Sequence, residues 1–480
     1  MNLNQTLQEK YPHLEVSVLK LSEVKKNIDF RIDDSFWTMK LIYNNKLNYK
    51  KIGECLLKSQ YGISINMNEG GDGIPIYRMN DIDNMLCNFE VKKYALIDKN
   101  ELQTFRLNYG DVLFNRTNSY EFVGRTGIFY NNRENFVFAS YLVRLVCNKE
   151  ILLPEYLTVF LNTHIGKKEI RRRARPSINQ TNVNPEELKE IKIPIFPMEF
   201  QLEIQNLVKD SHKALEESKE LYKKAEETLY LELGLDPKNP LQSLLDSKTN
   251  NPTNSPNISI HTLKESFLKT GRLDSEYYQK KYEINEKIIM NKKYTVLDNL
   301  VSITKSIEPG SNLYKNKGIP FIRVTNLTQY GLSEGDVFLD EKDFFPQYLQ
   351  ILYPKKDTIL FSKDGSVGIA YCVKEDKEVI TSGAILHLNI KDKENILPEY
   401  LTLFLNSIFV KLQAQRDCGG SIISHWRIED IKKVLVAILD IKIQEKIAKY
   451  IQESFNLRKK SKQLLDNAKN KVEEQIQGKT

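Results

Sequence analysis

The sequence predicts an α+β protein with two copies of one domain, joined by two long helices that pack as an antiparallel coiled coil with pseudo-twofold symmetry. Three observations predict this architecture: a long internal repeat, short apolar runs bounded by turn residues in each copy, and one heptad pattern at the end of each copy. A chain of 480 residues has room for about three units of ordinary size.

The internal repeat is clearest in one block of ten residues. The segment LPEYLTVFLN at 153–162 returns as LPEYLTLFLN at 397–406, so that only Val159 and Leu403 differ. Other segments recur in the same order, roughly 240 to 247 residues apart: 31–37 with 272–278, 73–78 with 318–323, 111–114 with 357–361, and 201–204 with 444–447. The two copies are therefore whole domains, and such a molecule can contact two places on one partner.

Each copy is predicted to hold short strands followed by a helix. The strand signals are apolar and aromatic runs at 74–77, 112–114, 140–146, 359–361 and 384–390. Helices are expected at 153–170 and 397–413, each with a proline in its first turn. Turn-rich loops lie between them, and the glycine-rich one at 362–368 is the tightest. We place the first domain at 1–198 and the second at 262–441.

The two long helices are predicted from a seam of small and apolar residues. Between Ile204 and Leu229 these residues alternate in steps of four and three, and the same steps recur from Ile447 to Val472 with Arg458 as a charged interruption. We predict a central helix at 199–235 and a C-terminal helix at 442–480. Each would be about 50 Å long at 1.5 Å per residue. The alternative is two amphipathic helices that pack on their own domains.

The segment at 236–261 is predicted to be the linker between the copies. Its first 24 residues hold four prolines, several Asn and Ser, and few apolar residues.

Composition and charge limit the function classes. Five separated cysteines without a Cys-X-X-Cys pair argue against disulfides and structural zinc, and favour the cytoplasm. No apolar run is long enough to span a membrane, and the first residues do not resemble a secretory signal. The net charge of +7 is compatible with nucleic-acid binding but does not by itself predict it.

Catalytic motifs are not found. Asn184, Asn239 and Asn251 each precede a proline, but none begins the Asn-Pro-Pro-aromatic motif of adenine methyltransferases. No glycine-rich phosphate loop ends in Gly-Lys-Ser/Thr, and the six histidines are not spaced as metal ligands. We therefore predict no catalytic residue and no metal site.

Basic and polar residues near strand ends and in turn-rich loops of both copies are candidates for contact with duplex DNA. For the arginines the alternative is an internal salt bridge, and for the loops at 177–181 and 421–427 it is a capped turn before the next helix. The candidates are Arg78, Arg116, Arg125, Arg171, Arg172, Arg173, Arg175, Ser177, Gln180, Arg323, Lys363, Ser366, Arg416, Ser421, His425 and Arg427.

The chain resembles, over essentially its whole length, the specificity subunits of type I restriction-modification systems. The resemblance lies in the duplicated order of segments, the LPEYL blocks, the IPIFP segment that leads into the first long helix at 193–204, and the Gly-Ser-Val-Gly loop at 365–368. Two places depart from the repeat: Tyr120–Gly124 replaces the glycine loop in the first copy, and 438–445 lacks the prolines that precede the first long helix.

The resemblance implies a fold and a function. It implies two target-recognition domains that read a bipartite DNA target, and no catalysis by this chain. It implies two methyltransferase (modification) subunits and restriction/translocase subunits as partners, which use S-adenosylmethionine, ATP and magnesium. Arg31 with Asp33, and Arg272 with Asp274, would pair internally or form a docking surface for the methyltransferase, with Trp37, Tyr277 and Tyr278 packed nearby. The alternative function is a structural scaffold that bridges protein partners.

Overall fold

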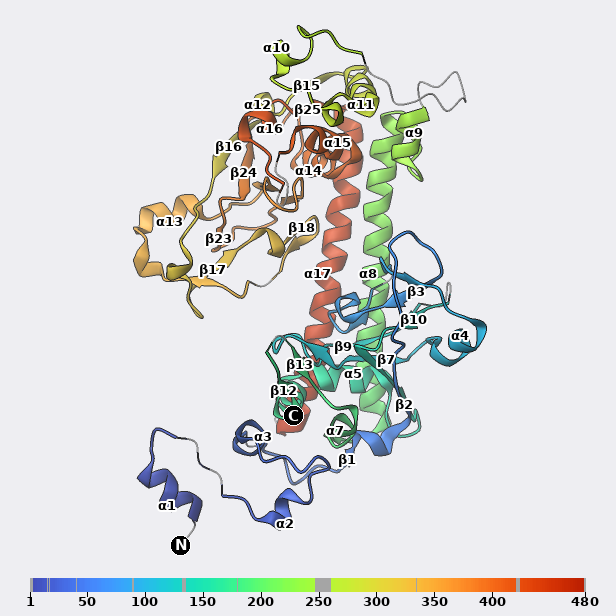
Figure 1. The fold of residues 1–480 in the computed structure, drawn as a ribbon, viewed down its shortest axis with the longest axis vertical. Helices are drawn as coiled ribbons and strands as arrows, with labels where there is room; N and C mark the ends of the chain where they lie inside the picture. Colours follow the sequence, from blue (N-terminus) through green and yellow to red (C-terminus); the bar gives the residue numbers. More distant parts are fainter. Residues whose placement is uncertain are drawn as a thin grey trace. The chain divides into compact units, whose positions relative to one another are not determined.

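The computed structural model describes residues 3–14, 16, 18–39, 41–88, 90–131, 135–178, 180–246, 260–333, 335–419 and 424–478. The chain divides into two compact units, residues 1–215 with 458–480 (unit 1) and residues 216–457 (unit 2). Both units mix helices and sheets, as expected for an α+β protein (Figure 1). The boundaries between the units fall inside the two long helices, α8 (Met198–Glu232) and α17 (Ile441–Gln477).

Unit 1 is built on a six-stranded sheet and three smaller ones. The large sheet has the order β2 (Leu56–Tyr61), β11 (Leu142–Cys147), β7 (Val112–Asn115), β9 (Thr126–Ile128), β5 (Leu86–Cys87) and β4 (Ile82–Asp83). The second has β10 (Val137–Phe138), β3 (Ile74–Tyr77) and β6 (Tyr94–Ala95); the third has β12 (Arg175–Pro176), β13 (Thr181–Asn182) and β8 (Thr117–Asn118); β1 (Tyr49–Lys51) pairs with β14 (Lys192–Pro194).

Its shorter helices are α1 (Leu3–Lys10), α2 (Leu21–Val24), α3 (Asp34–Thr38), α4 (Lys99–Phe105), α5 (Pro154–Asn162), α6 (His164–Arg173) and α7 (Pro185–Lys189), with 3-10 turns η1 (Ile52–Cys55) and η2 (Met79–Asp81).

Unit 2 repeats this plan. Its four-stranded sheet has the order β16 (Val301–Lys305), β24 (Ile385–Ile390), β21 (Ile359–Ser362) and β22 (Ala370–Cys372). A three-stranded sheet has the order β20 (Phe338–Leu339), β17 (Ile319–Ile322) and β23 (Ile380–Thr381). Two further pairs are β18 (Leu327–Thr328) with β19 (Gly331–Leu332), and β15 (Tyr294–Val296) with β25 (Leu435–Ala437). Its helices are α9 (Pro240–Asp246), α10 (Phe267–Thr270), α11 (Lys280–Met290), α12 (Leu297–Leu300), α13 (Pro346–Leu352), α14 (Pro398–Asn406), α15 (Ile408–Asp417) and α16 (Ile428–Ile431), with 3-10 turns η3 (Ser275–Tyr278), η4 (Ser311–Leu313), η5 (Val324–Asn326) and η6 (Glu341–Asp343).

The internal repeat extends to strand order and register. The order β2-β11-β7-β9 matches β16-β24-β21-β22, and the parallel pair β3·β10 matches β17·β23. In unit 1 Arg144 lies opposite Leu113 on one side and Gln60 on the other, and in unit 2 His387 lies opposite Leu360 and Thr304. Position 144 of the first copy is therefore position 387 of the second.

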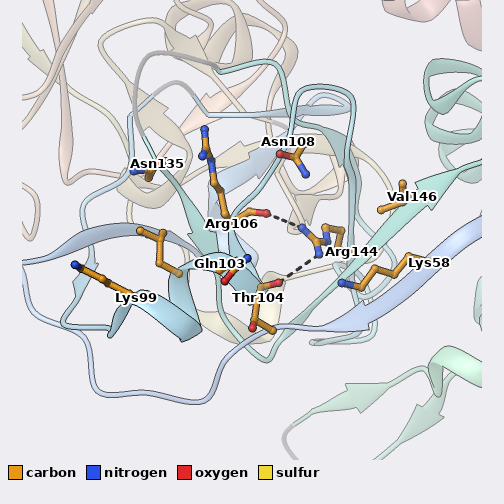
Figure 2. Close-up of a pocket in the computed structure, with 10 residues that line it drawn as sticks. Lys58, Lys99, Gln103, Thr104, Arg106, Asn108, Asn135, Arg144 and Val146 are labelled. Carbon is orange, nitrogen blue, oxygen red and sulfur yellow. Dashed lines mark hydrogen bonds between the residues drawn. The ribbon is translucent and has the colours of Figure 1, made fainter.

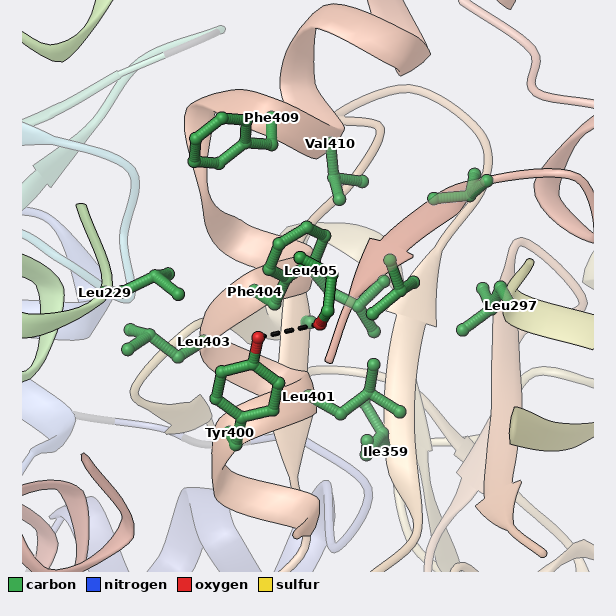
Figure 3. Packing of buried hydrophobic residues seen from close by; sticks show 14 of the residues in the cluster. Leu229, Leu297, Ile359, Tyr400, Leu401, Leu403, Phe404, Leu405, Phe409 and Val410 are labelled. Carbon is green, nitrogen blue, oxygen red and sulfur yellow. Dashed lines mark hydrogen bonds between the residues drawn. The ribbon is translucent and has the colours of Figure 1, made fainter. Parts of the chain in front are cut away.

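The LPEYL blocks repeat because they build the same part of each core. Tyr400 is fully buried and donates a hydrogen bond of 2.8 Å to the carbonyl oxygen of Ala437, among the apolar side chains seen in Figure 3. Tyr156 of the first copy is buried in the same way and donates to the carbonyl oxygen of Pro194 at 2.7 Å. Each tyrosine thus ties a core helix to the strand that precedes a long helix, and satisfies its buried hydroxyl.

The single helices expected at 153–170 and 397–413 are each broken into two. Thr163 and Ser407 have extended backbones, with ψ of 165° and 167°, and each hydroxyl donates to the carbonyl oxygen three residues earlier at 2.6 Å. Thr163 Oγ1 also accepts from the amide of Gly166 at 3.0 Å, which caps α6. A Cβ on Gly166 would lie 2.0 Å from the carbonyl oxygen of Phe160, so the sharp corner requires glycine.

The predicted seam residues are buried within their units, except Leu215 and Arg458, which are half-buried. In unit 1, Val208 of α8 belongs to the same core cluster as Ala468 of α17, and the hydroxyls of Ser211 and Ser461 lie 2.7 Å apart. Lys471 also pairs with Glu203 at 2.6 Å. From Glu203 to Ser211 the residue numbers rise along α8, while those of their partners fall from Lys471 to Ser461 along α17, so the two helices run antiparallel here. In unit 2 the seam serines Ser218 and Ser454 lie 3.0 Å apart.

The predicted linker is not wholly irregular. Its first part contains α9, whose Leu244 is buried in the core of unit 2, while residues 247–259 lie outside the described part of the chain. Within the described residues, no helix combines the length and apolar character that a membrane crossing needs.

Candidate nucleic-acid interface

In unit 1 the three-stranded sheet β12-β13-β8 brings together candidates that are far apart in sequence. The amide of Val183 donates to the carbonyl oxygen of Arg116 at 2.9 Å, and the Thr117 hydroxyl donates to the side chain of Asn182 at 2.6 Å. Arg116 therefore lies beside the hairpin that carries Ser177 and Gln180. The loop after β7 and this hairpin form one surface, as a shared binding site requires.

The tip of this hairpin is a tight turn that presents exposed groups. The amide of Ser177 donates to the carbonyl oxygen of Gln180 at 2.7 Å, and both side chains are exposed. Ile178 between them is 98% exposed. An apolar side chain held in water by a closed turn can contact a thymine methyl group, and its polar neighbours can bond base edges or phosphates. Sequence reasoning did not select Ile178, since a lone apolar residue in a polar loop is a weak signal.

Unit 2 shows the same arrangement of segments. The amide of Trp426 donates to the carbonyl oxygen of Lys363 at 2.8 Å, as Val183 does to Arg116 in unit 1, and the amide of Gly365 donates to Ser424 at 2.9 Å. Lys363 therefore occupies in unit 2 the place that Arg116 occupies in unit 1.

Asp364 lies between two of the candidate cations of unit 2. It forms an ion pair with Lys363 and a hydrogen bond of 2.9 Å with Nδ1 of His425. His425 is largely exposed, whereas Lys363 is mostly covered. The carboxylate neutralises the charge of Lys363 and holds the ring of His425, so a DNA phosphate must compete with Asp364 for both side chains. The sequence did not identify Asp364, because its partner His425 lies 61 residues away.

A cleft of about 480 Å³ lies beside this loop. Its floor includes Trp426, which is fully buried and whose Nε1 has no hydrogen-bond partner among the described residues. The remaining lining residues are Lys305, Lys363, Arg427, Ile428, Glu429, Asp430 and Lys433. Lys305 and Lys433 are cations of this site that the sequence analysis missed.

Arg78 and Arg323 occupy equivalent positions after strands β3 and β17. The amide of Arg78 donates to Asp81 at 2.8 Å and that of Arg323 to Asn326 at 3.1 Å, and each residue begins a 3-10 turn. Arg78 also lies 3.8 Å from Asp81, and Arg323 pairs with Asp336. Both guanidinium groups remain partly exposed, so these internal pairs leave room for a phosphate contact.

Several arginines of unit 1 lie over aromatic rings. Arg116 lies 5.1 Å from the ring centroid of Tyr61 and Arg125 4.1 Å from that of Phe122. Arg171 and Arg172 lie similarly over Tyr120 and Phe36, and Arg172 also donates to the carbonyl oxygen of Phe36. Burial lowers the pKa of Arg172 from its ordinary value. The rings orient these cations but do not neutralise them.

Arg173 and Arg416 differ from the other candidates because both side chains are largely covered and pair with carboxylates of the same unit. Arg173 is 6% exposed and pairs with Glu169, which is itself buried. Arg416 is mostly covered and pairs with Glu286 and Asp417. Burial opposes its charge, but these carboxylates outweigh burial and raise the pKa of Arg416 above its ordinary value. Neither guanidinium forms part of an open surface, so we leave both out of the proposed interface.

The remaining candidates are placed as follows. Arg175 pairs with Asp29 and is partly exposed, and Arg427 pairs with Asp430 at 2.7 Å and is largely exposed. Ser366 is exposed in the glycine loop, where its carbonyl oxygen accepts from the Ser362 hydroxyl. Ser421 lies outside the described residues.

The paired Arg and Asp near the start of each copy form one duplicated motif. Arg31 pairs with Asp33 at 2.6 Å and Arg272 with Asp274 at 2.7 Å. The indole of Trp37 donates to the carbonyl oxygen of Arg31, and the hydroxyl of Tyr278 donates to that of Arg272. The residue before each arginine has a positive φ, 51° at Phe30 and 72° at Gly271. The internal pairing expected for these residues is therefore present; a docking role stays a prediction.

Comparison with known proteins gives one family. Residues 64–227 and 293–467 both match the model of the type I restriction modification DNA specificity domain, with one match in each copy. A stretch of 151 residues is 30% identical to the putative type I restriction enzyme MjaX specificity subunit of Methanocaldococcus jannaschii, over 31% of this chain and 35% of that protein. A stretch of 161 residues is 27% identical to the type I restriction enzyme EcoKI specificity subunit of Escherichia coli K12, over 33% of this chain and 34% of that protein. The matched stretches thus span about a third of each curated relative.

Two solved structures align with this chain over most of its length. The type I restriction-modification S subunit from M. genitalium is 15% identical, with a TM-score of 0.40 over 90% of this chain and 96% of that chain. The HsdS subunit from Thermoanaerobacter tengcongensis is 12% identical, with a TM-score of 0.30 over 91% of this chain and 98% of that chain.

Proposed function

Since this chain belongs to the family of type I restriction modification DNA specificity domains, we propose that it is the DNA sequence-recognition subunit of a type I restriction-modification complex. It catalyses nothing itself. It binds the target sequence and directs adenine methylation or DNA cleavage by partner subunits. The curated relatives are named as specificity subunits, and they match this chain over about a third of their length.

The observation that carries the proposal is the repeated loop arrangement. Arg116 with the hairpin at 177–180 in unit 1, and Lys363 with the loop at 424–427 in unit 2, are built on equivalent backbone hydrogen bonds. Each of these two loop sites is small, so each can contact only a short stretch of base pairs. Two such sites suit two short DNA sequences better than one long sequence. The target is therefore bipartite, with two specified half-sites separated by an unspecified gap, and each unit reads one of them.

The two long helices set the gap between the half-sites. They pack as one antiparallel coiled coil related by a pseudo-twofold axis, and the predicted seam residues that are buried within each unit support this packing. A helix of 35 residues is about 50 Å long, roughly one and a half turns of B-form DNA. In this arrangement the coil acts as a spacer, and its length decides how many base pairs remain unread.

The partners are duplex DNA, two modification (methyltransferase) subunits and restriction/translocase subunits, and the complex works in the cytoplasm. The duplicated Arg-X-Asp motifs at 31–33 and 272–274 support two equivalent docking surfaces for the methyltransferase. S-adenosylmethionine, ATP and magnesium are used by the partner subunits, and this chain holds no cofactor. Among the described residues, no group of three or more His, Cys, Asp or Glu side chains is placed to hold a metal ion.

Methylome sequencing tests this function. Cells with and without the gene are compared for N6-methyladenine at single-base resolution, and the methyltransferase subunit is present in both. We expect one gapped motif that disappears with the gene. A continuous motif would exclude the two-unit reading. An unchanged methylome, together with stable binding of this chain to two protein partners, would favour the structural scaffold instead.

A further inference from the structure

A second basic cleft lies in unit 1, and none of its lining residues belongs to the candidate interface described above (Figure 2). It measures about 790 Å³ and is formed by α4, β2 and β11 with the segments that follow α4 and precede β10. The lining residues are Lys58, Lys99, Leu102, Gln103, Thr104, Arg106, Asn108, Asn135, Arg144 and Val146.

Among the described residues, the lining carries four cations and no carboxylate. Lys58, Lys99 and Arg106 are exposed, and none of them forms an ion pair with a described residue. The other polar groups are amides and a hydroxyl, which can donate hydrogen bonds to an anion. Positive charge gathered in a concave surface raises the local concentration of anions. The cleft is therefore suited to a negatively charged ligand.

Arg144 forms the inner wall of this cleft. It is buried, and it donates to the carbonyl oxygens of Arg106 at 2.6 Å and Thr104 at 3.4 Å, the two bonds drawn in Figure 2. A carboxylate oxygen of Asp111 lies 3.5 Å from the guanidinium of Arg144. The Nε of Arg144 has no hydrogen-bond partner in the described part of the chain. These contacts hold the end of α4 against the sheet and fix the shape of the cleft.

The second copy shows that the fold does not require these charges. Strand register places His387 at the position of Arg144 and Ser302 at that of Lys58. Strands β7 and β21 are equivalent, and counting back from their first residues places Pro346 at the position of Lys99 and Tyr353 at that of Arg106. Backbone hydrogen bonds support this alignment: the amide of Arg106 donates to the carbonyl oxygen of Leu102, and that of Tyr353 to the carbonyl oxygen of Leu349. All four cations are thus replaced by a neutral side chain or a buried histidine. The second copy has Lys355 at the position of Asn108, but Lys355 pairs with Asp376. Charges that the fold can dispense with are most simply explained by a ligand specific to unit 1.

We propose that this cleft binds backbone phosphates of the DNA duplex and that unit 1 therefore holds DNA by a phosphate contact that unit 2 lacks. The inference rests on the proposed function and deepens it. The described lining residues include no aromatic ring on which a free base could stack, which disfavours a mononucleotide. Lys58 lies three residues, about 10 Å, along β2 from Tyr61, whose ring contacts Arg116. The two side chains point to opposite faces of β2, which is the edge strand of its sheet, so a duplex strand that crosses this edge can contact both.

The test compares the full chain with the variant Lys58→Ser/Arg106→Gln. Position 58 receives the residue that the second copy uses, and Arg144 is retained, so that the fold is preserved. Binding to a duplex of random sequence is measured at several salt concentrations. We expect affinity to fall on the order of tenfold at physiological salt, and the slope of log Kobs against log salt to become shallower by roughly two, one for each lost phosphate contact. Two single variants test the charge at position 58: Lys58→Ser should weaken binding, whereas Lys58→Arg, which keeps the charge, should retain most of it.

The matched control is Lys25→Gln/Lys26→Gln, which removes two exposed charges from unit 1 outside the cleft and should leave the slope unchanged. An unchanged slope in the cleft variant would overturn the inference, as would an equal loss in the control. Inorganic pyrophosphate is titrated in parallel; tight binding that the cleft variant loses, with an unchanged DNA slope, would assign the cleft to a small anion instead. Discrimination between target and random duplexes tests the proposed function separately. A parent chain without any affinity for DNA would overturn both.

Discussion

Thr381 and His387 are joined by a hydrogen bond of 2.8 Å between Oγ1 and Nε2, inside the sheet region of unit 2. His387 is 6% exposed, and burial lowers its pKa to about 4 from an ordinary value near 6.5. The position corresponds to Arg144 of unit 1, where a permanent cation is matched by the nearby carboxylate of Asp111. Thr358 replaces that carboxylate in unit 2, so the equivalent side chain stays neutral there.

This difference predicts acid sensitivity in unit 2. The folded pKa of His387 lies below the unfolded one, so its full contribution to stability is present above about pH 6.5 and is lost as the pH falls toward 4, because the unfolded chain takes up the proton first. The loss reaches at most about 3 kcal/mol. Urea unfolding at pH 7 and pH 4.5 should show a smaller pH effect in His387→Gln than in the parent. His425→Gln, which changes a largely exposed histidine, is the control, and an equal pH effect in all three proteins would contradict the prediction.

The fully buried positions of the seam between the long helices should be intolerant of charge. Val208 is fully buried against α17 within unit 1, whereas Leu202 on the same helix is 43% exposed. Val208→Asp places an unpaired carboxylate in the core and should lower the free energy of unfolding by about 3 kcal/mol or more. Leu202→Asp should change it by less than about 1 kcal/mol. Denaturant melts of the two variants measure the contrast, and similar values would mean that Val208 does not face the seam.

Removal of a negative charge should strengthen DNA binding by unit 2. Asp364→Asn releases Lys363 and His425 from their shared carboxylate. We expect tighter binding to duplexes and a salt slope steeper by about one, because one more cation can meet a phosphate. Asp376→Asn removes an equal charge from an exposed pair with Lys355 and serves as the control. Fluorescence anisotropy at several salt concentrations gives both quantities; weaker binding by Asp364→Asn would show that the carboxylate orients the cations for contact.

Substitutions of Arg116 and Arg173 should affect different properties of the protein, DNA binding in the first case and folding stability in the second. Arg116→Ala should weaken binding and discrimination at the half-site read by unit 1. A lost base contact costs about 1–3 kcal/mol, whereas a lost phosphate contact makes the salt slope shallower by about one. Arg173→Ala leaves Glu169 buried without its cation and should cost about 3 kcal/mol of folding stability, with little effect on DNA binding by the folded protein. Binding assays and thermal melts on both variants decide this; a stable Arg173→Ala protein with poor DNA binding would return Arg173 to the interface.

Candidate side chains could be listed from the sequence but not sorted. Arg171 and Arg173 look alike there, yet one is exposed over Tyr120 and the other is buried against Glu169. Helical periodicity places two residues two positions apart on different faces, but it does not say which face is covered. The corner at Thr163 was missed for a similar reason, since one hydroxyl and one glycine decide it within a segment of strong helical character.

Duplication, α+β class and two long helices followed from the sequence by itself, because repeats and periodicity are properties of residue order. Tertiary structure decided which charges are available. Lys58, Lys99, Arg106 and Arg144 come together only because β2, α4 and β11 fold against one another. Asp364 contacts His425 only because the loop at 424–427 lies beside the loop at 363–365. Electrostatic interactions depend on distance in space and on burial, and neither quantity is encoded locally along the chain.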